Sequence, residues 1–512
     1  MGVVVGSRPS LVWLPALLAF AGAVTQLANA QRAISNDASS THIDHIQNGL
    51  LPSATIQGKP LPRMMLENRM RHYHVPGVSI AFFDHGRVIW TQAYGVADVR
   101  TARPVTPETL FQAGSISKPI AALGALRLVE QGKLKLDANV NDELRSWKLP
   151  ENEFTVEQKV TLRRILSHSA GTTVHGYSGY NPGDPLPTTV QILDGAKPAN
   201  SPAVRVETVP GTVYRYSGGG MMIMQLMMMD ATGQDFPGLM HDLVLGPVGM
   251  SHSTYEQPLP PQRQLTAAHG YTANGEEILG GSHVIPEMVA GGLWSTPTDL
   301  ALAAIELQNE YLGKSHKVLS QPMAHEMLTR QKEGWGLGFE LSKPGMTPRF
   351  DHFGVNAGFV SVLQAYRDGG SGIVIMTNGQ DGEKLVTEIL RAVAHEYDWP
   401  DFKPSEHVLA KLDPATAPKL VGTYVLPDPD GQDKLIVTVR DGRPYLSGSY
   451  SIGSTYHFTI AAPVELLPEA SSQFFTTTTG GTSFRFEKNS DGAVNRCIVI
   501  SGTNQREAKK NL

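Results

Sequence analysis

One proline fixes where a long apolar helix of this chain must begin. Residues 111–119 (FQAGSISKP) are followed by the apolar run 120–129, so Pro119 stands at the junction. Proline has no backbone N–H and its ring collides with the carbonyl four residues back, which restricts it to the first turn of a helix. The sequence therefore predicts a buried helix beginning beside Pro119, with Ser115 and Lys118 three positions apart on one face at its positive end.

The pair Ser115 and Lys118 has two explanations. A serine hydroxyl is a poor nucleophile unless a base lies within about 3 Å, and a neutral, partly desolvated lysine can be that base. A serine that caps a helix, followed by a solvated lysine, has the same spacing. Taken alone, the tetrad favours the structural explanation, because such spacings are frequent by chance.

Two further segments reverse that balance. Residues 210–220 (PGTVYRYSGGG) precede a predicted helix, and residues 351–359 (DHFGVNAGF) lead into a predicted strand. With the Ser-x-x-Lys tetrad they resemble the three boxes of the serine β-lactamase and penicillin-recognising family, especially its branch of class C β-lactamases, D-Ala-D-Ala carboxypeptidases and esterases. Tyr216 matches the tyrosine of the Tyr-x-Asn box. His352-Phe353-Gly354 stands where the family has Lys-Thr-Gly or His-x-Gly, next to Val355.

The resemblance covers roughly residues 60–400 and includes segments outside the three boxes. Residues 76–81 (PGVSIA), 161–171 (TLRRILSHSAG) and 291–296 (GGLWST) also resemble the family. It implies an α/β fold in which an antiparallel sheet is flanked by helices and accompanied by a helical lobe. Local patterns agree, because the alternating runs on either side of Asp84-His85-Gly86 predict a β-hairpin.

The resemblance also assigns roles. Ser115 would be the acylated nucleophile, and Lys118 would take or relay its proton. Tyr216 would act as general base and acid, which requires Lys118 and burial to lower a pKa that starts at about 10. The backbone N–H groups of Ser115 and Val355 would form the oxyanion hole, with Gly354 between strand and nucleophile. Neither a metal nor a cofactor is implied.

Two positions depart from the family pattern. Gly218 replaces the asparagine that holds a substrate amide, and His352 replaces a lysine that would bind a substrate carboxylate. Because imidazole is mostly neutral at pH 7, these changes favour an esterase, a peptidase for D-amino-acid substrates or another acyl hydrolase over an efficient β-lactamase. Acidification towards pH 6 is expected to restore part of the carboxylate preference unless burial depresses the pKa of His352.

The function predicted is an exported serine hydrolase that forms an acyl-serine on an ester, a β-lactam or a D-amino-acid amide bond. The alternative is a penicillin-binding-like or sensory module that keeps the pocket without turnover. The expected partner is a small-molecule or peptidoglycan-like acyl substrate. The net charge of −5 carries no basic block, so no nucleic-acid partner is expected.

The N-terminus predicts export. Arg8 precedes the apolar run 11–24 and the small-x-small tripeptide 28–30, a pattern typical of a cleaved secretory signal. A stable membrane anchor is not expected, because it usually needs about 20 apolar residues. Cys497 is the only cysteine, so no intramolecular disulfide can form. A disulfide-free exported protein fits a bacterial periplasm or medium.

The sequence pattern changes near residue 400. Prolines there precede short β-like runs and turn pairs such as Asp441-Gly442 and Asp491-Gly492. The runs predict a small antiparallel barrel, which resembles the lipocalin-like β domain appended in some family members. The expected divisions are a signal peptide at 1–30, a loose polar lead-in at 31–56, the hydrolase domain at 57–402, a Pro-rich linker at 403–418 and the β domain at 419–512.

Overall fold

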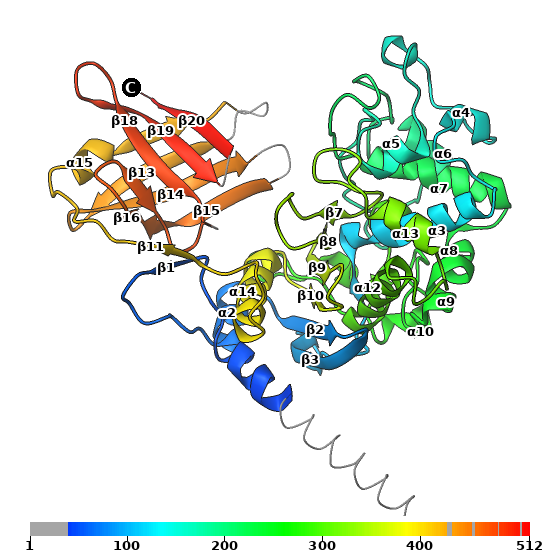
Figure 1. Ribbon diagram of the computed structural model, residues 1–512, viewed down its shortest axis with the longest axis horizontal. Helices are drawn as coiled ribbons and strands as arrows, with labels where there is room; N and C mark the ends of the chain where they lie inside the picture. Colours follow the sequence, from blue (N-terminus) through cyan, green and yellow to red (C-terminus); the bar gives the residue numbers. More distant parts are fainter. Residues whose placement is uncertain (1–38, 428–432, 453–455, 480, 502–503, 512) are drawn as a thin grey trace, which may run out of the picture.

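The computed structural model describes residues 39–427, 433–452, 456–479, 481–501 and 504–511. The predicted signal at 1–30 lies outside these residues. Figure 1 shows a helical lobe in cyan and green, a sheet built from both ends of the first 400 residues, and a β domain in orange and red. Within the described residues, no helix combines the length and the apolar character needed to cross a bilayer.

The central sheet is antiparallel throughout, and among the described strands its order is β4-β3-β2-β10-β9-β8-β7. The predicted hairpin is confirmed as β2 and β3, and β10 inserts between β2 and β9. Strands from opposite ends of the domain are therefore neighbours, as the predicted fold class requires. The bounds are β2 (Gly77–Asp84), β3 (Arg87–Asp98), β4 (Arg103–Pro104), β7 (Glu340–Leu341), β8 (Arg349–Asn356), β9 (Phe359–Tyr366) and β10 (Gly372–Thr377).

Helices cover both faces of this sheet. The amphipathic α14 (Gly382–Glu396) and α2 (Leu66–His72) pack on one face, and α12 (Pro297–Tyr311) packs on the other. Residues 39–47, within the segment expected to be a loose lead-in, are helical instead. Tertiary packing explains the difference, because Ile46 is buried in the cluster under α14 and His42 and His45 each contact Glu396, at 2.7 and 2.9 Å.

The helical lobe is organised around α3 (Ser117–Glu130), which begins where Pro119 predicts. Its apolar side chains are buried against the methionine-rich α7 (Gly218–Thr232), so the methionines of α7 are core residues. A two-stranded pair, β5 (Phe111–Gln112) with β6 (Trp294–Ser295), leads the chain into α3. The other α-helices are α4 (Val140–Glu143), α5 (Leu162–Leu166), α6 (Thr189–Asp194), α8 (Phe236–Met240), α9 (Gly246–Val248), α10 (Pro261–Gln264), α11 (Met288–Gly291) and α13 (Gln321–Met327).

The C-terminal domain is a nearly closed antiparallel sheet with its own apolar core, as predicted. Among the described residues its order is β15-β14-β13-β12-β20-β19-β18-β17-β16. Cys497 lies in that core, and burial raises the pKa of its thiol. The elements are α15 (Ala417–Leu420), β12 (Gly422–Val425), β13 (Lys434–Arg440), β14 (Arg443–Ile452), β15 (Tyr456–Glu465), β16 (Leu467–Pro468), β17 (Gln473–Phe475), β18 (Ser483–Lys488), β19 (Val494–Ser501) and β20 (Asn504–Lys510).

A short parallel strand pair marks the junction between the two domains. In the segment expected to be a linker, β11 (Ser405–His407) pairs with β1 (Ala54–Ile56). The His407 ring stacks on Phe475 of the β domain with ring centroids 4.0 Å apart. The Ser53 hydroxyl donates to the Thr477 carbonyl at 3.0 Å. The β domain is thus joined to the rest of the chain by side-chain contacts as well as by the backbone.

Candidate active site

Ser115 lies on a 3₁₀ turn, η1 (Gly114–Ile116), that runs directly into α3. Gly114 opens this turn with a φ of +54°, a left-handed conformation that glycine adopts without strain. Lys118, one turn along, donates from its Nζ to the Ser115 Oγ at 2.8 Å and to the Ala290 carbonyl at 2.7 Å. The structure thus places the two residues of the predicted tetrad in direct contact.

Burial gives Lys118 the properties of a base. The residue is 2% exposed, and its Nζ donates to a hydroxyl and a carbonyl rather than to a carboxylate. Desolvation penalises the charged ammonium and lowers the pKa of Lys118 to about 7. Near neutral pH a large fraction of this lysine therefore carries a free lone pair beside the Ser115 hydroxyl.

Tyr216 completes the contact from the loop that precedes α7. Its hydroxyl hydrogen-bonds Ser115, and the Lys118 Nζ lies 5.0 Å from its ring centroid. Burial raises the pKa of Tyr216, and the hydrogen bond from Ser115 offsets only part of that rise. The lowered pKa that a general-base role for Tyr216 requires is therefore not found, because burial disfavours the charged phenolate.

Two glycines allow β8 to approach the nucleophile. A Cβ at Gly354 would lie 2.0 Å from the Ala113 carbonyl and 3.1 Å from the Ser115 nitrogen. A Cβ at Gly114 would lie 2.5 Å from the Val355 nitrogen. The backbone groups expected to form the oxyanion hole thus belong to two segments in direct contact, and no side chain fits between those segments.

His352 lies on β8, at the position where the family resemblance implies a lysine or a histidine, and it is neutral. Its Nδ1 donates to the Phe353 carbonyl at 2.6 Å, which leaves Nε2 as an acceptor. The Nε2 atom is buried without a hydrogen-bond partner among the described residues. Burial, assisted by the charge of Lys118, lowers the pKa of His352 to about 3. Burial therefore depresses this pKa, the condition under which no restored carboxylate preference is expected, and acidification to pH 6 does not protonate His352.

Aromatic rings surround Tyr216. Its ring centroid lies 4.2 Å from that of His168, 5.0 Å from His175 and 5.8 Å from Trp335. His168 is buried and its Nδ1 accepts from the Ser217 backbone N–H at 3.3 Å, a contact that fixes the start of α7. Sequence analysis missed Trp335, because it comes from a loop between α13 and β7 whose path depends on distant contacts.

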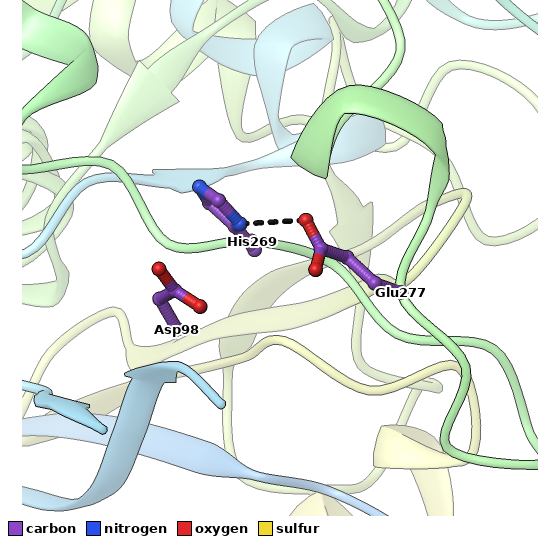
Figure 2. A group of neighbouring side chains, drawn as sticks. All are labelled: Asp98, His269 and Glu277. Atoms are coloured by element: carbon purple, nitrogen blue, oxygen red, sulfur yellow. Dashed lines mark hydrogen bonds and ion pairs between the residues drawn. The ribbon is translucent and has the colours of Figure 1, made fainter. Parts of the chain in front are cut away.

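A separate polar cluster lies at the end of β3. One ligand atom from each of Asp98, His269 and Glu277 lies within 4.8 Å of the other two, the only such group among the described residues (Figure 2). His269 Nδ1 contacts the Glu277 carboxylate at 2.8 Å. The Asp98 carboxylate accepts from the Thr101 hydroxyl at 2.7 Å and from the Arg100 N–H at 2.9 Å. These contacts close the turn after β3 and satisfy the buried carboxylate.

Comparison with known proteins agrees with this geometry. A family model described as Beta-lactamase matches residues 63–397. The chain belongs to the beta-lactamase family. Penicillin-binding protein 4 of Amycolatopsis lactamdurans is 26% identical over 369 residues, which cover 69% of this chain and 93% of that protein.

Solved structures of two penicillin-binding proteins or homologues share the fold. The octameric penicillin-binding protein homologue from Pyrococcus abyssi has a TM-score of 0.58 at 21% identity and covers 86% of this chain and 98% of its own. The penicillin binding protein from Bacillus halodurans has a TM-score of 0.51 at 19% identity. The match covers 65% of this chain and 99% of that protein's chain. The first likeness therefore extends beyond the segment that the family model matches.

Proposed function

We propose that this protein is an exported, periplasmic or secreted serine hydrolase that acts through an acyl-serine at Ser115. The 2.8 Å contact between the Lys118 Nζ and the Ser115 Oγ carries the proposal, because it joins a hydroxyl to a buried amine. Membership of the beta-lactamase family supports the same chemistry. The proposed substrate is a small or peptidoglycan-like acyl compound.

Acylation begins with transfer of the Ser115 hydroxyl proton to the neutral amine of Lys118. The Oγ then bonds to the acyl carbon of the substrate, and the carbonyl π electrons move to oxygen, where the N–H groups of Ser115 and Val355 bind the oxyanion. Collapse of this intermediate breaks the bond to the leaving group. The Lys118 ammonium supplies the proton that the leaving oxygen or nitrogen takes up, either directly or through Tyr216, whose phenol gives its proton to the leaving group and regains one from Lys118. Either route leaves Lys118 a neutral amine.

Deacylation uses the same groups in reverse. A water molecule transfers one proton to the Lys118 amine and attacks the acyl carbon with its oxygen. The second intermediate then releases the Ser115 Oγ, which regains its proton from the Lys118 ammonium. The acid product departs and the starting state is restored.

The neutral His352 supports a preference for esters or D-amino-acid amides over β-lactams that carry a carboxylate. Its Nδ1 proton is directed to a backbone carbonyl, so only the Nε2 lone pair is left for a ligand. A lone pair accepts from a substrate N–H or O–H and repels a carboxylate oxygen. A lysine at this position would instead form a charge-assisted hydrogen bond with the carboxylate.

A binding module without turnover is the second candidate, and the raised pKa of Tyr216 favours it. A phenol that stays protonated cannot accept a proton from water, which leaves Lys118 as the base for deacylation. If the acyl group blocks water from Lys118, the acyl-enzyme persists and the protein works as a covalent binder.

Covalent labelling tests both candidates. Purified 31–512 is incubated with a fluorophosphonate, a nitrophenyl ester, nitrocefin and a D-Ala peptide, and the acyl-enzyme is followed by intact mass. Ser115→Ala should abolish labelling and lower the ester rate by at least about 10³-fold, whereas the exposed Ser251→Ala should leave both unchanged. An ester rate for Ser115→Ala within tenfold of wild type would contradict the proposal. Transient labels indicate a hydrolase, and permanent labels from every ester and peptide indicate a binding module.

A further inference from the structure

The cluster of Asp98, His269 and Glu277 joins segments that are far apart in the sequence. Asp98 is the last residue of β3, whereas His269 and Glu277 lie between α10 and the 3₁₀ turn η4 (Leu279–Gly281). One oxygen of each carboxylate and one ring nitrogen of His269 lie within 4.8 Å of one another, and Figure 2 shows the three side chains turned towards one space. The contact around Ser115 is made by other residues, so this cluster is separate from the proposed catalytic chemistry.

Backbone contacts hold the three residues in this arrangement. The His269 N–H donates to the carbonyl of Ala97 in β3 at 2.7 Å. Tyr271 and Glu277 face each other in an antiparallel bridge, and the Tyr271 hydroxyl accepts from the Val99 N–H at 2.7 Å. The fold therefore positions the side chains in advance, which reduces the conformational entropy that a bound ligand would have to remove.

Asp98 supplies a buried and ionised carboxylate. Burial by itself would raise the pKa of Asp98, but hydrogen bonds from Thr101 and Arg100 and the charge of His269 hold it below its ordinary value. Its Oδ1 accepts from the N–H groups of Arg100 and Thr101 at 2.9 and 3.3 Å, and its Oδ2 accepts from the Thr101 hydroxyl at 2.7 Å. The Arg100 guanidinium lies 3.6 Å from Oδ2, but its side chain is 72% exposed and can turn into solvent. A carboxylate oxygen has two lone-pair sites, so Oδ2 can bind one more partner.

The other two side chains can be reached from solvent. The side chains of His269 and Glu277 are 28% and 34% exposed, and the His269 Nδ1 lies 2.8 Å from a Glu277 oxygen. Two atoms bound to one tetrahedral zinc ion lie about 3.3–3.5 Å apart, because each is bound at about 2.0–2.2 Å. Even a pair at the 4.8 Å limit would thus have to close by at most about 1.5 Å, a movement that partly exposed side chains can make.

We propose that Asp98, His269 and Glu277 bind a zinc ion, with water in the remaining position. One imidazole nitrogen and two carboxylate oxygens are ligands that zinc accepts. Magnesium and calcium fit less well, because they need six or more ligands and prefer oxygen to imidazole. The ring nitrogen that binds the ion carries no proton, so the neutral imidazole keeps its proton on the other nitrogen. The ion ties the segment between α10 and η4 to the end of β3.

Titration of untagged, EDTA-treated 31–512 with zinc chloride tests the inference. Calorimetry should find one zinc ion per chain, and magnesium and calcium chloride should bind far more weakly. His269→Ala and Glu277→Gln should each weaken zinc binding by at least about tenfold, because each removes one of three ligands. His241→Ala is the matched control, since it removes another exposed histidine beside a carboxylate, that of Asp242 at 3.2 Å. It should bind zinc as the wild type does.

Thermal melting separates loss of the site from loss of the fold. Zinc should raise the melting temperature of the wild type, because it binds the folded chain, and should leave those of His269→Ala and Glu277→Gln unchanged. Without zinc, both variants should melt cooperatively, since both side chains are partly exposed. No zinc binding by the wild type would overturn the proposal. Equal zinc affinity in the wild type and both variants would also overturn it, since the ion would then be bound elsewhere.

Discussion

At the scale of single residues, burial moves the two acid–base groups beside Ser115 in opposite directions. It lowers the pKa of the Lys118 ammonium to about 7 and raises the pKa of the Tyr216 phenol. Both groups are driven towards their neutral forms, an amine with a lone pair and a phenol with a proton. Before any substrate binds, the Ser115 hydroxyl therefore has both a base, the Lys118 amine, and an acid, the Tyr216 phenol, beside it.

The pH dependence of acylation should report Lys118. Protonation removes its lone pair, so the rate with a neutral ester should fall as pH drops below about 7 and level off above it. The measurement is kcat/KM for p-nitrophenyl propionate between pH 5 and 9. In Lys118→Met, kcat/KM should be at least about 10²-fold lower than in the wild type and should not fall further below pH 7. If kcat/KM of that variant still fell below about pH 7, the pH dependence could not be assigned to Lys118.

His352 should control the selection of charged substrates. Since its pKa is about 3, the kcat/KM ratio of a carboxylate-bearing ester to a neutral ester should stay constant from pH 8 to pH 5. The ratio cancels the loss that protonation of Lys118 causes for both substrates. His352→Lys should raise the ratio about tenfold or more by adding a charge-assisted hydrogen bond. A ratio that rises in the wild type on acidification would show that His352 titrates within this range.

At the scale of elements, the site depends on the close approach of β8 to the turn that carries Ser115. A Cβ at Gly354 would press on the Ala113 carbonyl and the Ser115 nitrogen from the strand side. Asn356 fixes the far end of the same strand, because its Nδ2 donates to the Gln112 side chain at 2.8 Å and to the Gly291 carbonyl at 2.9 Å. The proposed oxyanion donors are thus positioned by a strand and not by any one side chain.

Gly354→Ala should separate folding from catalysis. The added methyl group displaces β8 from the nucleophile, so acylation should fall by about 10²- to 10³-fold, the cost of one lost oxyanion donor. Gly369→Ala, whose Cβ would meet nothing closer than 3.9 Å, is the matched control and should label normally. Labelling rate and melting temperature are measured for both. Normal labelling of Gly354→Ala would mean that the close approach does not position the oxyanion donors.

Elements with a strong local pattern could be predicted from the sequence. Pro119 located the start of α3, and the Asp84-His85-Gly86 turn located the β2–β3 hairpin. The helix at 39–47 could not be predicted, because its histidines contact Glu396, more than 350 positions away, and Ile46 is buried in the cluster under α14. Trp335 was missed for the same reason. The direction of the Tyr216 pKa required its burial to be known.

At the scale of the whole molecule, the described apolar side chains form three clusters. Two lie on opposite faces of the central sheet, and the third fills the C-terminal β domain. The two clusters around the sheet contain no residue beyond position 402. The catalytic part therefore has a complete core without the β domain, and the junction adds a ring stack and a few hydrogen bonds.

Removal of the β domain should leave a folded catalytic part. Residues 31–413 keep the β1–β11 pair and both sheet clusters, so acylation by a small ester should remain within a few fold of the full chain. The melting temperature should fall slightly, because the contacts of His407 and Ser53 with the β domain are lost. Solubility, labelling at Ser115 and thermal melting are the measurements. An insoluble or unlabelled product would show that the β domain supports the site.

Val78 pairs with Thr377, a residue almost 300 positions later in the chain. The central sheet can therefore form only after both segments have been synthesised. A ribosome adds about 5–20 residues per second, so β2 waits about 15–60 s for its neighbour β10. Until then it has only the hairpin with β3, and a lone hairpin is marginally stable in water. The nascent chain therefore spends this interval of its synthesis without a finished central sheet. The apolar residues of β2 that β10 later covers are exposed to water during that interval, which makes the unfinished sheet prone to aggregation.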